Sequence, residues 1–322
     1  MSMMVMLTQI ALPVILLVWL ALFPARGVFA LGVQALSVAA ALLGIGLAAL
    51  WTMPPFWMPY VYYGVFVVIM VRHLWRGRFK GGGAWQASGG QTLLVLLALG
   101  PGCLGGYMAF LAYQGRALPA VETVDIAPPF GPGTYLVAHG GSDAMVNVHL
   151  KTLDKSVARF RPWRGQSRAL DIFRISPLGI HKSGWLPSDP ARYTTFGTPV
   201  VAPCNGEIAK VVDGREDMPV PVMDRDHMAG NYAAINCGRF FVIMAHLRQD
   251  SVSVSVGDRV AVGDFLGEMG NSGNSSEPHL HVHAQRGLPE HAAFGGEPLA
   301  LTINGVFPVR NDRIRVAKPV AR

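Results

Sequence analysis

Three histidines alternate near the C-terminal end of the chain, at His279, His281 and His283 in the run PHLHVH. In a strand, side chains at positions i, i+2 and i+4 point to the same face. Imidazole is the commonest metal ligand among side chains and a base that titrates near neutrality. The run follows a turn-rich loop, residues 270–278, which is suited to shaping a cleft. The spacing therefore favours a metal site on a strand over ordinary surface histidines.

This run is the last of several characteristic pieces of sequence. Five of them stand in order between Phe196 and Gln285: FGTPVVAPCNGEI, GNYAAI, MAHL, VSVGDRVAVGDFLGEMGNSGNSSE and PHLHVH. Together they resemble the lysostaphin/LytM-type zinc endopeptidases, which cut peptidoglycan peptides. The H-x-H element after GNSGNSSEP is highly specific in this context, whereas the VGDRVAVGD turn alone is weak. With upstream pieces and the closing GEPLALTINGVFPVRNDRI, the resemblance covers roughly residues 135–314.

The resemblance implies a set of site residues. In that family a His, an Asp and the second His of H-x-H hold zinc, and two further histidines handle the water and the transition state. Matched to this chain, His281 is the third ligand, and Asp171 in RALDI occupies the place of the aspartate ligand. His279 and His246, the latter in MAHL, match the two histidines that do not bind the metal.

The first ligand departs from the usual family pattern, in which a His stands four residues before the Asp, because that position is Ser167 here. A subset of the family resembles N-x-H, a gap, and then Q-x-x-A-x-D. Residues 147–149 (NVH) and 166–171 (QSRALD) fit that form. We therefore expect His149 as the first ligand of one Zn²⁺ per chain, with His181 and His139 as the other candidates.

This ligand set has a physical logic of its own. Two neutral imidazoles and one carboxylate leave the fourth tetrahedral position open for water, as in catalytic rather than structural zinc sites. Zinc lowers the pKa of that water towards about 7 and polarises a scissile carbonyl. We expect His279 to transfer the proton and His246 to stabilise the oxyanion, although the roles are exchangeable. His283 has no place in this scheme and is expected to support a ligand or to line the cleft.

The elements that must position these residues are short strands broken by turns, with no helical period of useful length. Predicted strands cover residues 135–138, 169–175, 199–202, 207–212, 232–236, 240–244, 252–256, 265–269 and 279–285. They predict a mainly antiparallel β domain over residues 134–314, followed by a tail, 315–322. The resemblance implies a LytM-like β-sandwich, or barrel-sandwich hybrid, for this zinc peptidase domain.

Residues 1–116 are predicted to form an α-helical transmembrane region. Up to Val121 there are six basic residues and no Asp or Glu, so the other 21 Lys and Arg nearly balance the 20 acidic residues. The basic excess is thus a membrane feature and argues against nucleic-acid binding. Apolar stretches at about 4–23, 28–50, 56–71 and 92–113 predict four spans. A signal peptide is the competing interpretation of the first stretch. Residues 117–133, rich in proline, are predicted to be an extended linker.

The bias of Lys and Arg orients the region. Arg26 and the run from Arg72 to Lys80 are expected on the cytoplasmic side, and the uncharged, aromatic segment 51–63 outside. The chain is therefore predicted to be a multi-pass protein of the bacterial inner membrane with its C-terminal domain on the periplasmic or extracellular side. There Cys204 and Cys237, which flank two predicted strands, form either a disulfide or two buried thiols.

These features predict a membrane-anchored zinc metalloendopeptidase that hydrolyses peptidoglycan peptides. The alternative is a non-catalytic LytM-like module that binds or regulates in cell-wall remodelling. Phosphotransfer, lipoyl and biotinyl carriers share part of the pattern, but a phosphocarrier works in the cytoplasm. The other two need a lysine at a hairpin tip, and residues 211–286 have none. The peptide bond cut, and a regulatory partner in the membrane, stay open.

Overall fold

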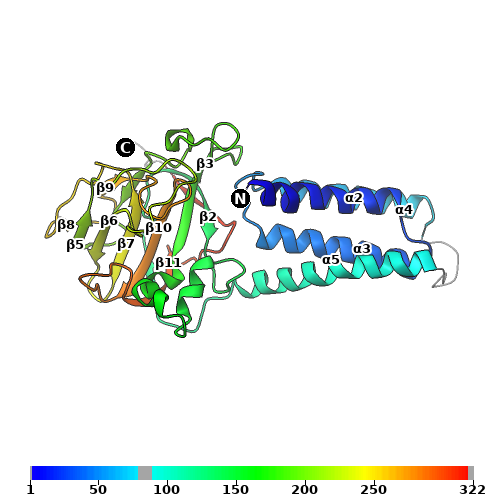
Figure 1. Ribbon diagram of the computed structural model, residues 1–322, viewed down its shortest axis with the longest axis horizontal. Coiled ribbons are helices and arrows are strands. Elements are labelled where there is room, and N and C mark those ends of the chain that lie inside the picture. The colour runs from blue at the N-terminus through cyan, green and yellow to red at the C-terminus, as the bar shows by residue number, and fades with distance from the viewer. Residues whose placement is uncertain (1, 79–88, 318–322) are drawn as a thin grey trace. The chain divides into compact units, whose positions relative to one another are not determined.

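The structure is a computed structural model that describes residues 2–78 and 89–317. It divides into two compact units, residues 1–114 and 115–322. The first is helical and the second is built of strands (Figure 1). Part of the predicted cytoplasmic loop, including Lys80, and the last five residues of the predicted tail lie outside the described residues.

Over its described residues, 2–78 and 89–114, the helical unit contains four helical segments. The first combines α1 (Ser2–Val5), the π-helix η1 (Met6–Ala11) and α2 (Leu12–Leu22). The others are α3 (Val28–Ala48), α4 (Met58–Trp75) and α5 (Gly89–Gln114). Within the described residues, three stretches are long and apolar enough to cross a membrane: Met3–Leu22, Val28–Ala48 and Thr92–Gln114. The fourth predicted span corresponds to α4, so four spans stay a prediction.

Helices α3 and α5 pack closely through small residues. A Cβ added to Gly105 would lie 2.4 Å from Cα of Ala41, and one added to Gly102 would lie 2.7 Å from Cβ of Ser37. Such approaches let helix backbones pack within a bilayer, where apolar side chains gain little from leaving lipid. Pro101, inside α5, falls within this packed stretch. Gly102 and Gly105 of α5 are thus small residues that approach α3, at Ser37 and Ala41.

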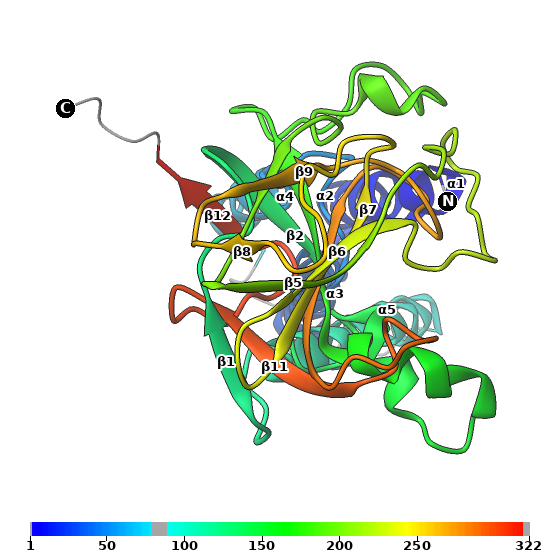
Figure 2. The ribbon, with the colours of Figure 1, turned by 90° about the vertical axis from the view of Figure 1, so that its left-hand side faces the viewer.

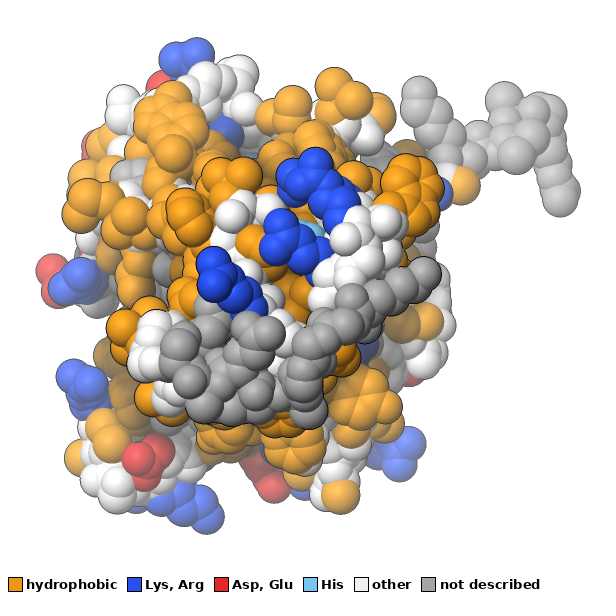
Figure 3. All heavy atoms as spheres, turned by 90° about the vertical axis from the view of Figure 1, so that its right-hand side faces the viewer, with side chains coloured by type: hydrophobic (Ala, Val, Ile, Leu, Met, Phe, Trp, Pro, Cys, Tyr) orange, Lys and Arg blue, Asp and Glu red, His pale blue; other side chains and the backbone are white. Residues whose placement is uncertain are grey.

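Basic side chains gather at the end of the helical unit where α2 and α4 finish. Nε2 of His73 lies 3.0 Å from the carbonyl oxygen of Leu20, and Arg72 donates to the carbonyl of Ala21, so the two helix ends lie together. Figure 3 shows Lys and Arg side chains clustered on this face. The exposed members of the cluster are Arg26, Arg76 and Arg78. This arrangement agrees with the predicted grouping of positive charge on one side.

The second unit is a β domain whose main sheet runs through its centre (Figure 2). Its strands stand in the order β12-β2-β3-β10-β7-β6-β5-β8, and β11 pairs with both β10 and β1. The bounds are β1 Thr123–Ile126, β2 Gly133–His139, β3 Leu170–Ile175, β5 Gly206–Val212, β6 Asn231–Asn236, β7 Phe241–Leu247, β8 Arg259–Val260, β10 Leu280–Arg286, β11 Glu297–Ile303 and β12 Arg313–Val316. A second sheet pairs β4 (Pro199–Val201) with β9 (Phe265–Glu268). All pairings are antiparallel except β1 with β11, so the mainly antiparallel domain is confirmed.

The period of two along the central strands separates the core from the site. Leu280 and Val282 of β10 face the main hydrophobic core, with Ile172 of β3 and Met244 of β7 beside them. The residues between them therefore project from the opposite face of the sheet. The alternation predicted from the sequence thus separates apolar residues from functional ones.

Several segments differ from their predicted form, and β11 and β12 are strands in segments that were not predicted as strands. Residues 252–256 lie outside every strand, and β8 follows them instead. The predicted linker contains β1, which pairs in register from Thr123 opposite Ala300 to Ile126 opposite Ile303. Val124 and Ile126 are buried in the core, and this burial of apolar side chains explains why the segment joins the sheet.

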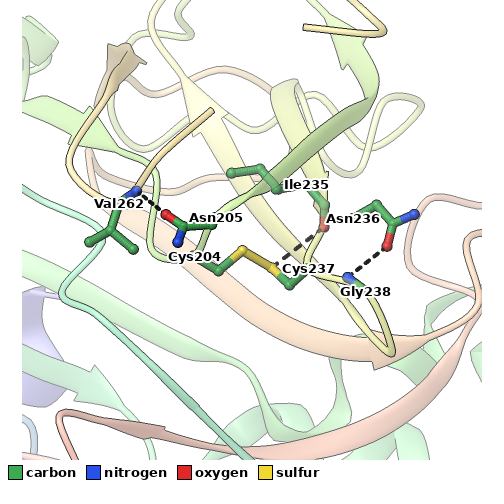
Figure 4. The surroundings of a disulfide bond; sticks show 7 residues. All are labelled: Cys204, Asn205, Ile235, Asn236, Cys237, Gly238 and Val262. Carbon is green, nitrogen blue, oxygen red and sulfur yellow. Dashed lines mark hydrogen bonds between the residues drawn. A yellow bond between two sulfur atoms is a disulfide. The ribbon is translucent and has the colours of Figure 1, made fainter. Parts of the chain in front are cut away.

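The hairpin of β5 and β6 brings Cys204 and Cys237 together. Glu207 pairs with Asn236, so the two cysteines stand at the same end of the pair. They form a disulfide with Cα atoms 6.0 Å apart (Figure 4). Of the two alternatives that the sequence left open, the structure has the disulfide.

Candidate active site

His149, Asp171 and His281 converge on one point. Nε2 of His149 lies 2.9 Å from Oδ2 of Asp171, and Nδ1 of His281 lies 3.0 Å from Oδ1 of the same carboxylate. One candidate ligand atom from each residue falls within 4.8 Å of the others. The three residues predicted to hold the metal are therefore neighbours, although 110 positions separate Asp171 from His281.

Sheet register places two of the three. His281 on β10 is directly opposite Asp171 on β3, and on its other side it is opposite Ala245 of β7. Directly opposed residues in an antiparallel pair have their Cβ atoms about 4.5–5.5 Å apart. The carboxylate and the imidazole therefore meet without help from any loop.

His149 reaches the sheet from a segment of 3₁₀ turns, η2 (Val148–Leu153) and η3 (Ala158–Arg168). Asn147 anchors this segment through hydrogen bonds. Its side-chain oxygen accepts from the backbone N–H of His149, and its amide donates to the carbonyls of Gly141 and Ala169. Ala169 is two residues before Asp171, so Asn147 fixes the distance between the two candidate ligands.

Ser167, where the usual family pattern has its first histidine, has a structural place instead. Its Oγ lies 2.5 Å from the carbonyl oxygen of Arg164 and 2.7 Å from Oγ1 of Thr152. Oγ1 of Thr152 lies 2.8 Å from the carbonyl oxygen of His149, so the two hydroxyl hydrogens are divided among three contacts. The serine is fully buried and braces the turn that carries the upstream histidine.

His246 and His279 form a second pair beside the first cluster, with ring centroids 4.8 Å apart. Nδ1 of His246 lies 2.8 Å from the carbonyl oxygen of Ser272, and Nδ1 of His279 lies 2.8 Å from that of Glu277. A carbonyl only accepts, so each Nδ1 carries the hydrogen and each Nε2 is left as the reactive nitrogen. Nε2 of His279 is 3.5 Å from Oδ1 of Asp171.

Burial and the carboxylate set the protonation of the site. Burial alone would raise the pKa of Asp171, but the charges and hydrogen bonds of His149 and His279 hold it well below its usual range. Burial lowers the pKa of His281 to about 4, against the opposing effect of Asp171, and lowers the pKa of His246 well below its usual value. Two imidazoles and a carboxylate are the donor set of a catalytic zinc site, so these residues fit a zinc ion.

A groove of about 380 Å³ opens onto the cluster. It is lined by Val148, His149, Lys151, Thr152, Arg159, Phe160, Trp163, Gln166, Asp171, Met223, Met228, His246, Asn274, Ser276, His279, His281 and Phe294. Met223 and Met228 come from the long connection between β5 and β6. All five predicted site residues line this one groove.

The two fallback histidines are engaged elsewhere. Nε2 of His181 lies 3.3 Å from Oε2 of Glu277, on which Lys182 also converges. Nδ1 of His139 accepts from Arg310 at 2.9 Å, and burial lowers the pKa of His139 to about 3. Neither belongs to the cluster that could hold a metal ion.

Two residues with a part in the site, Gln285 and Phe294, were not anticipated. They adjoin His283, which was expected to support a ligand or to line the cleft and has the first of these places. It is absent from the groove lining and fully buried, with Nδ1 3.2 Å from Nε2 of His281. Gln285 continues this contact at Nε2 of His283, and Phe294 stacks on His281 with ring centroids 5.1 Å apart. The continued alternation HLHVHAQ was a usable signal for Gln285. Phe294, in a loop, had none.

A family model matches part of the β domain. Residues 192–292 match the model of peptidase family M23. That match includes His246, His279 and His281, whereas His149 and Asp171 lie before it.

Individual relatives match over limited lengths. The chain is 35% identical over 86 residues to the peptidoglycan DD-endopeptidase ShyA of Vibrio cholerae serotype O1, covering 26% of this chain and 20% of the relative. It therefore spans about a fifth of that relative. Among solved structures it is similar to the catalytic domain of lysostaphin from Staphylococcus simulans, with 28% identity, a TM-score of 0.23, and 30% of this chain and 66% of that one covered. A zinc-containing peptidase from Vibrio cholerae gives 26% identity, a TM-score of 0.21 and coverages of 27% and 23%. The β domain of this chain thus contains a region, residues 192–292, that matches peptidase family M23.

Proposed function

We propose that this chain is a membrane-anchored zinc metalloendopeptidase that hydrolyses peptide bonds in cell-wall peptidoglycan. One observation carries the proposal. His149 and Asp171, from outside the family match, meet His281 from inside it, with ligand atoms within 4.8 Å of one another. A retained fold without catalysis would not need these three side chains to converge.

Peptidoglycan is proposed as the substrate because the relative ShyA is, by its name, a peptidoglycan DD-endopeptidase. The open groove also suits an extended peptide better than a compact small molecule, since it runs past all five site residues. Which cross-link or bridge is cut depends on the groove walls.

His149, Asp171 and His281 would hold the zinc ion. When bound, zinc supplies a Lewis acid that activates water and polarises the scissile carbonyl. In our proposal Nε2 of His279 takes the proton of that water and returns it to the leaving amine. Nε2 of His246 can stabilise an oxyanion only while it carries a hydrogen, because its Nδ1–H is committed to Ser272. Either ring could carry that second hydrogen, so the two roles can be exchanged.

We further propose that the peptidase domain lies outside the cytoplasm. The gathering of Lys and Arg where α2 and α4 end supports a cytoplasmic face there. The Cys204–Cys237 disulfide also favours an oxidising compartment, since cytoplasmic thiols are kept reduced.

Zinc content and hydrolysis of purified muropeptides test the proposal together. In the detergent-purified full chain, Asp171→Ala and His281→Ala should each lose stoichiometric zinc and all hydrolysis. His291→Ala, an exposed histidine outside the cluster, is the matched control and should keep both. Hydrolysis that survives either ligand substitution would refute the assignment, and a wild-type protein without zinc would favour the non-catalytic module.

A further inference from the structure

A continuous chain of side-chain contacts runs along the buried face of β10, behind the candidate metal site. Nε2 of His281 lies 3.2 Å from Nδ1 of His283, and Nε2 of His283 lies 3.2 Å from Oε1 of Gln285. The three residues are at most 1% exposed. Strand alternation aligns them, so each ring bridges its two neighbours.

Gln285, at the end of this row of side-chain contacts, is anchored so that the orientation of its amide is fixed. The amide nitrogen of Gln285 donates to the carbonyls of Gly287 and Ala293, at 2.8 and 3.0 Å. Both amide hydrogens therefore have acceptors, and a flipped amide would set oxygen against two oxygens. Gly165 closes the other side, because a Cβ there would lie 1.8 Å from Oε1 of Gln285.

The anchored amide determines where each hydrogen lies. Oε1 of Gln285 can only accept, so Nε2 of His283 must carry the hydrogen of that contact. In a neutral ring Nδ1 of His283 is then an acceptor, and Nε2 of His281 must donate to it. Nδ1 of a neutral His281 is consequently left with a lone pair, which faces Oδ1 of Asp171 at 3.0 Å.

The groups packed around His281 and His283 shield this arrangement of hydrogens from water. Phe294 stacks on the ring of His281 and meets the ring of His283 edge-on, with centroids 5.1 and 4.8 Å apart. Among the described residues, both nitrogens of His283 already have side-chain partners. Two lone pairs facing each other in a buried site attract a cation.

We propose that Gln285 and His283 are positioning residues that keep the hydrogen of His281 on Nε2 and so reserve its Nδ1 for the metal. The inference rests on the proposed function, because it takes the cation to be the catalytic zinc ion. Partners of this kind typically contribute about 10–100-fold to metal affinity by fixing the tautomer and orientation of a ligand.

The test compares variants of the full chain in detergent. Gln285→Met removes the oxygen that receives the hydrogen of His283. His283→Leu removes the acceptor for His281, and His283→Asn, of nearly the same shape, keeps one. Thr302→Val removes a different buried hydroxyl, one that donates to Asp125 on the β1 side of the domain, and serves as the control.

Two measurements are made on each protein. Nitrogen NMR of ¹⁵N-histidine-labelled, metal-free protein at alkaline pH reports which ring nitrogen of His281 carries hydrogen. Competition with a chelator reports zinc affinity. We expect Nε2–H in wild type and Thr302→Val. In Gln285→Met the hydrogen should move to Nδ1, and zinc affinity should fall by about 10–100-fold. His283→Leu should lose affinity by a similar factor, whereas His283→Asn should regain most of it.

The outcomes separate the two proposals. Unchanged tautomer and zinc affinity in Gln285→Met would overturn the positioning role while leaving the zinc peptidase intact. If Gln285→Met does not fold, equal zinc affinities of His283→Leu and His283→Asn would overturn it instead. A wild type that binds no zinc would overturn the proposed function, and the tautomer shift would still decide whether Gln285 directs the ring.

Discussion

Histidines of the same kind take different parts in this domain because of what surrounds each ring. His181 lies against Glu277, with which Lys182 also pairs, and all three side chains are at most 8% exposed. His149 lies against Asp171 on the groove, where a metal ion would replace the contact between them. A carboxylate that is shared with Lys182 has its charge satisfied, so the His181 cluster is structural. Asp171, by contrast, contacts the imidazoles of His149 and His281, so its carboxylate can still bind a metal ion.

Glu277 provides a prediction at this scale. Hydrogen bonds and charges of His181 and Lys182 hold the pKa of Glu277 below its usual range, although burial alone would raise it. Glu277→Gln leaves a buried cation without its counter-charge and should reduce the free energy of unfolding at pH 7 by about 3–5 kcal/mol. Because the folded pKa lies below the unfolded one, this contribution is present above the unfolded value. It is lost as the pH falls through the folded pKa.

Thermal unfolding of the detergent-purified full chain, followed from pH 7 to pH 3, measures the difference between wild type and Glu277→Gln. The two curves should converge towards acid, since a protonated Glu277 resembles glutamine. A constant offset at every pH would contradict the pairing. Asp224→Asn, which breaks an exposed contact with His227, is the control and should shift stability by less than about 1 kcal/mol.

Single residues were predictable to the extent that local spacing determined their neighbours. The H-x-H run places His281 and His279 because alternation is a property of any strand. His149 needed the resemblance, since nothing within its own segment says that Asn147 anchors it to Ala169. The role of Gln285 was not predicted, because it depends on hydrogen bonds to carbonyls of a loop that covers it in the folded domain. The sequence has no local pattern for such tertiary closure.

At the scale of elements, the η2–η3 segment carries the candidate ligand that the usual family pattern places four residues before the aspartate. It also brings charge to the groove. Residues 148–168 include one acidic residue, Asp154, and six basic ones: Lys151, Lys155, Arg159, Arg161, Arg164 and Arg168. Lys151 and Arg159 line the groove itself. This segment therefore combines a candidate metal ligand with a basic surface.

A basic wall should favour peptides that carry free carboxylates. Arg159→Glu should therefore raise the KM for acidic muropeptides by roughly two- to five-fold, the effect of about 0.5–1 kcal/mol for an exposed charge, with little change in kcat. Added salt should weaken the wild-type preference, because screening shortens the reach of exposed charges. Lys155→Glu changes the same charge in the same segment but outside the groove lining. Equal effects of the two substitutions would show that only overall charge matters.

Elements were predicted well where alternation and turns agreed, and poorly where pairing came from afar. Strands β5, β6 and β10 lie close to their predicted ranges. β1 was predicted to be linker because the prolines on both sides of it and its position suggested extended chain. Extended chain can pair with the free edge of a sheet. The 3₁₀ turns of η2 and η3 have no apolar period to recognise, so a sequence pattern could not announce them.

At the scale of the whole molecule, the number of membrane spans decides on which side each end lies. The helical unit offers an argument for four. The Tyr62 hydroxyl donates to the carbonyl of Gln9, and Nε2 of His73 lies 3.0 Å from the carbonyl oxygen of Leu20. Eleven residues separate the contacts in each helix, so α4 runs beside the first helical segment in the same direction and over the same length. If that first segment crosses a bilayer, α4 has the length to cross beside it.

The location of the N-terminus distinguishes four spans from three. With the peptidase domain outside, four spans put the N-terminus outside and Arg26 inside, whereas three spans without α4 put the N-terminus inside and Arg26 outside. The first arrangement follows the positive-inside rule, because no Lys or Arg precedes Arg26. We therefore expect a reporter that is active only outside the cytoplasm to be active at both termini. It should be inactive in the loop between α4 and α5, which follows Arg76 and Arg78. Activity after Arg322 with none at the N-terminus would show three spans, and a cytoplasmic signal after Arg322 would remove the peptidase domain from the compartment where the cell wall lies.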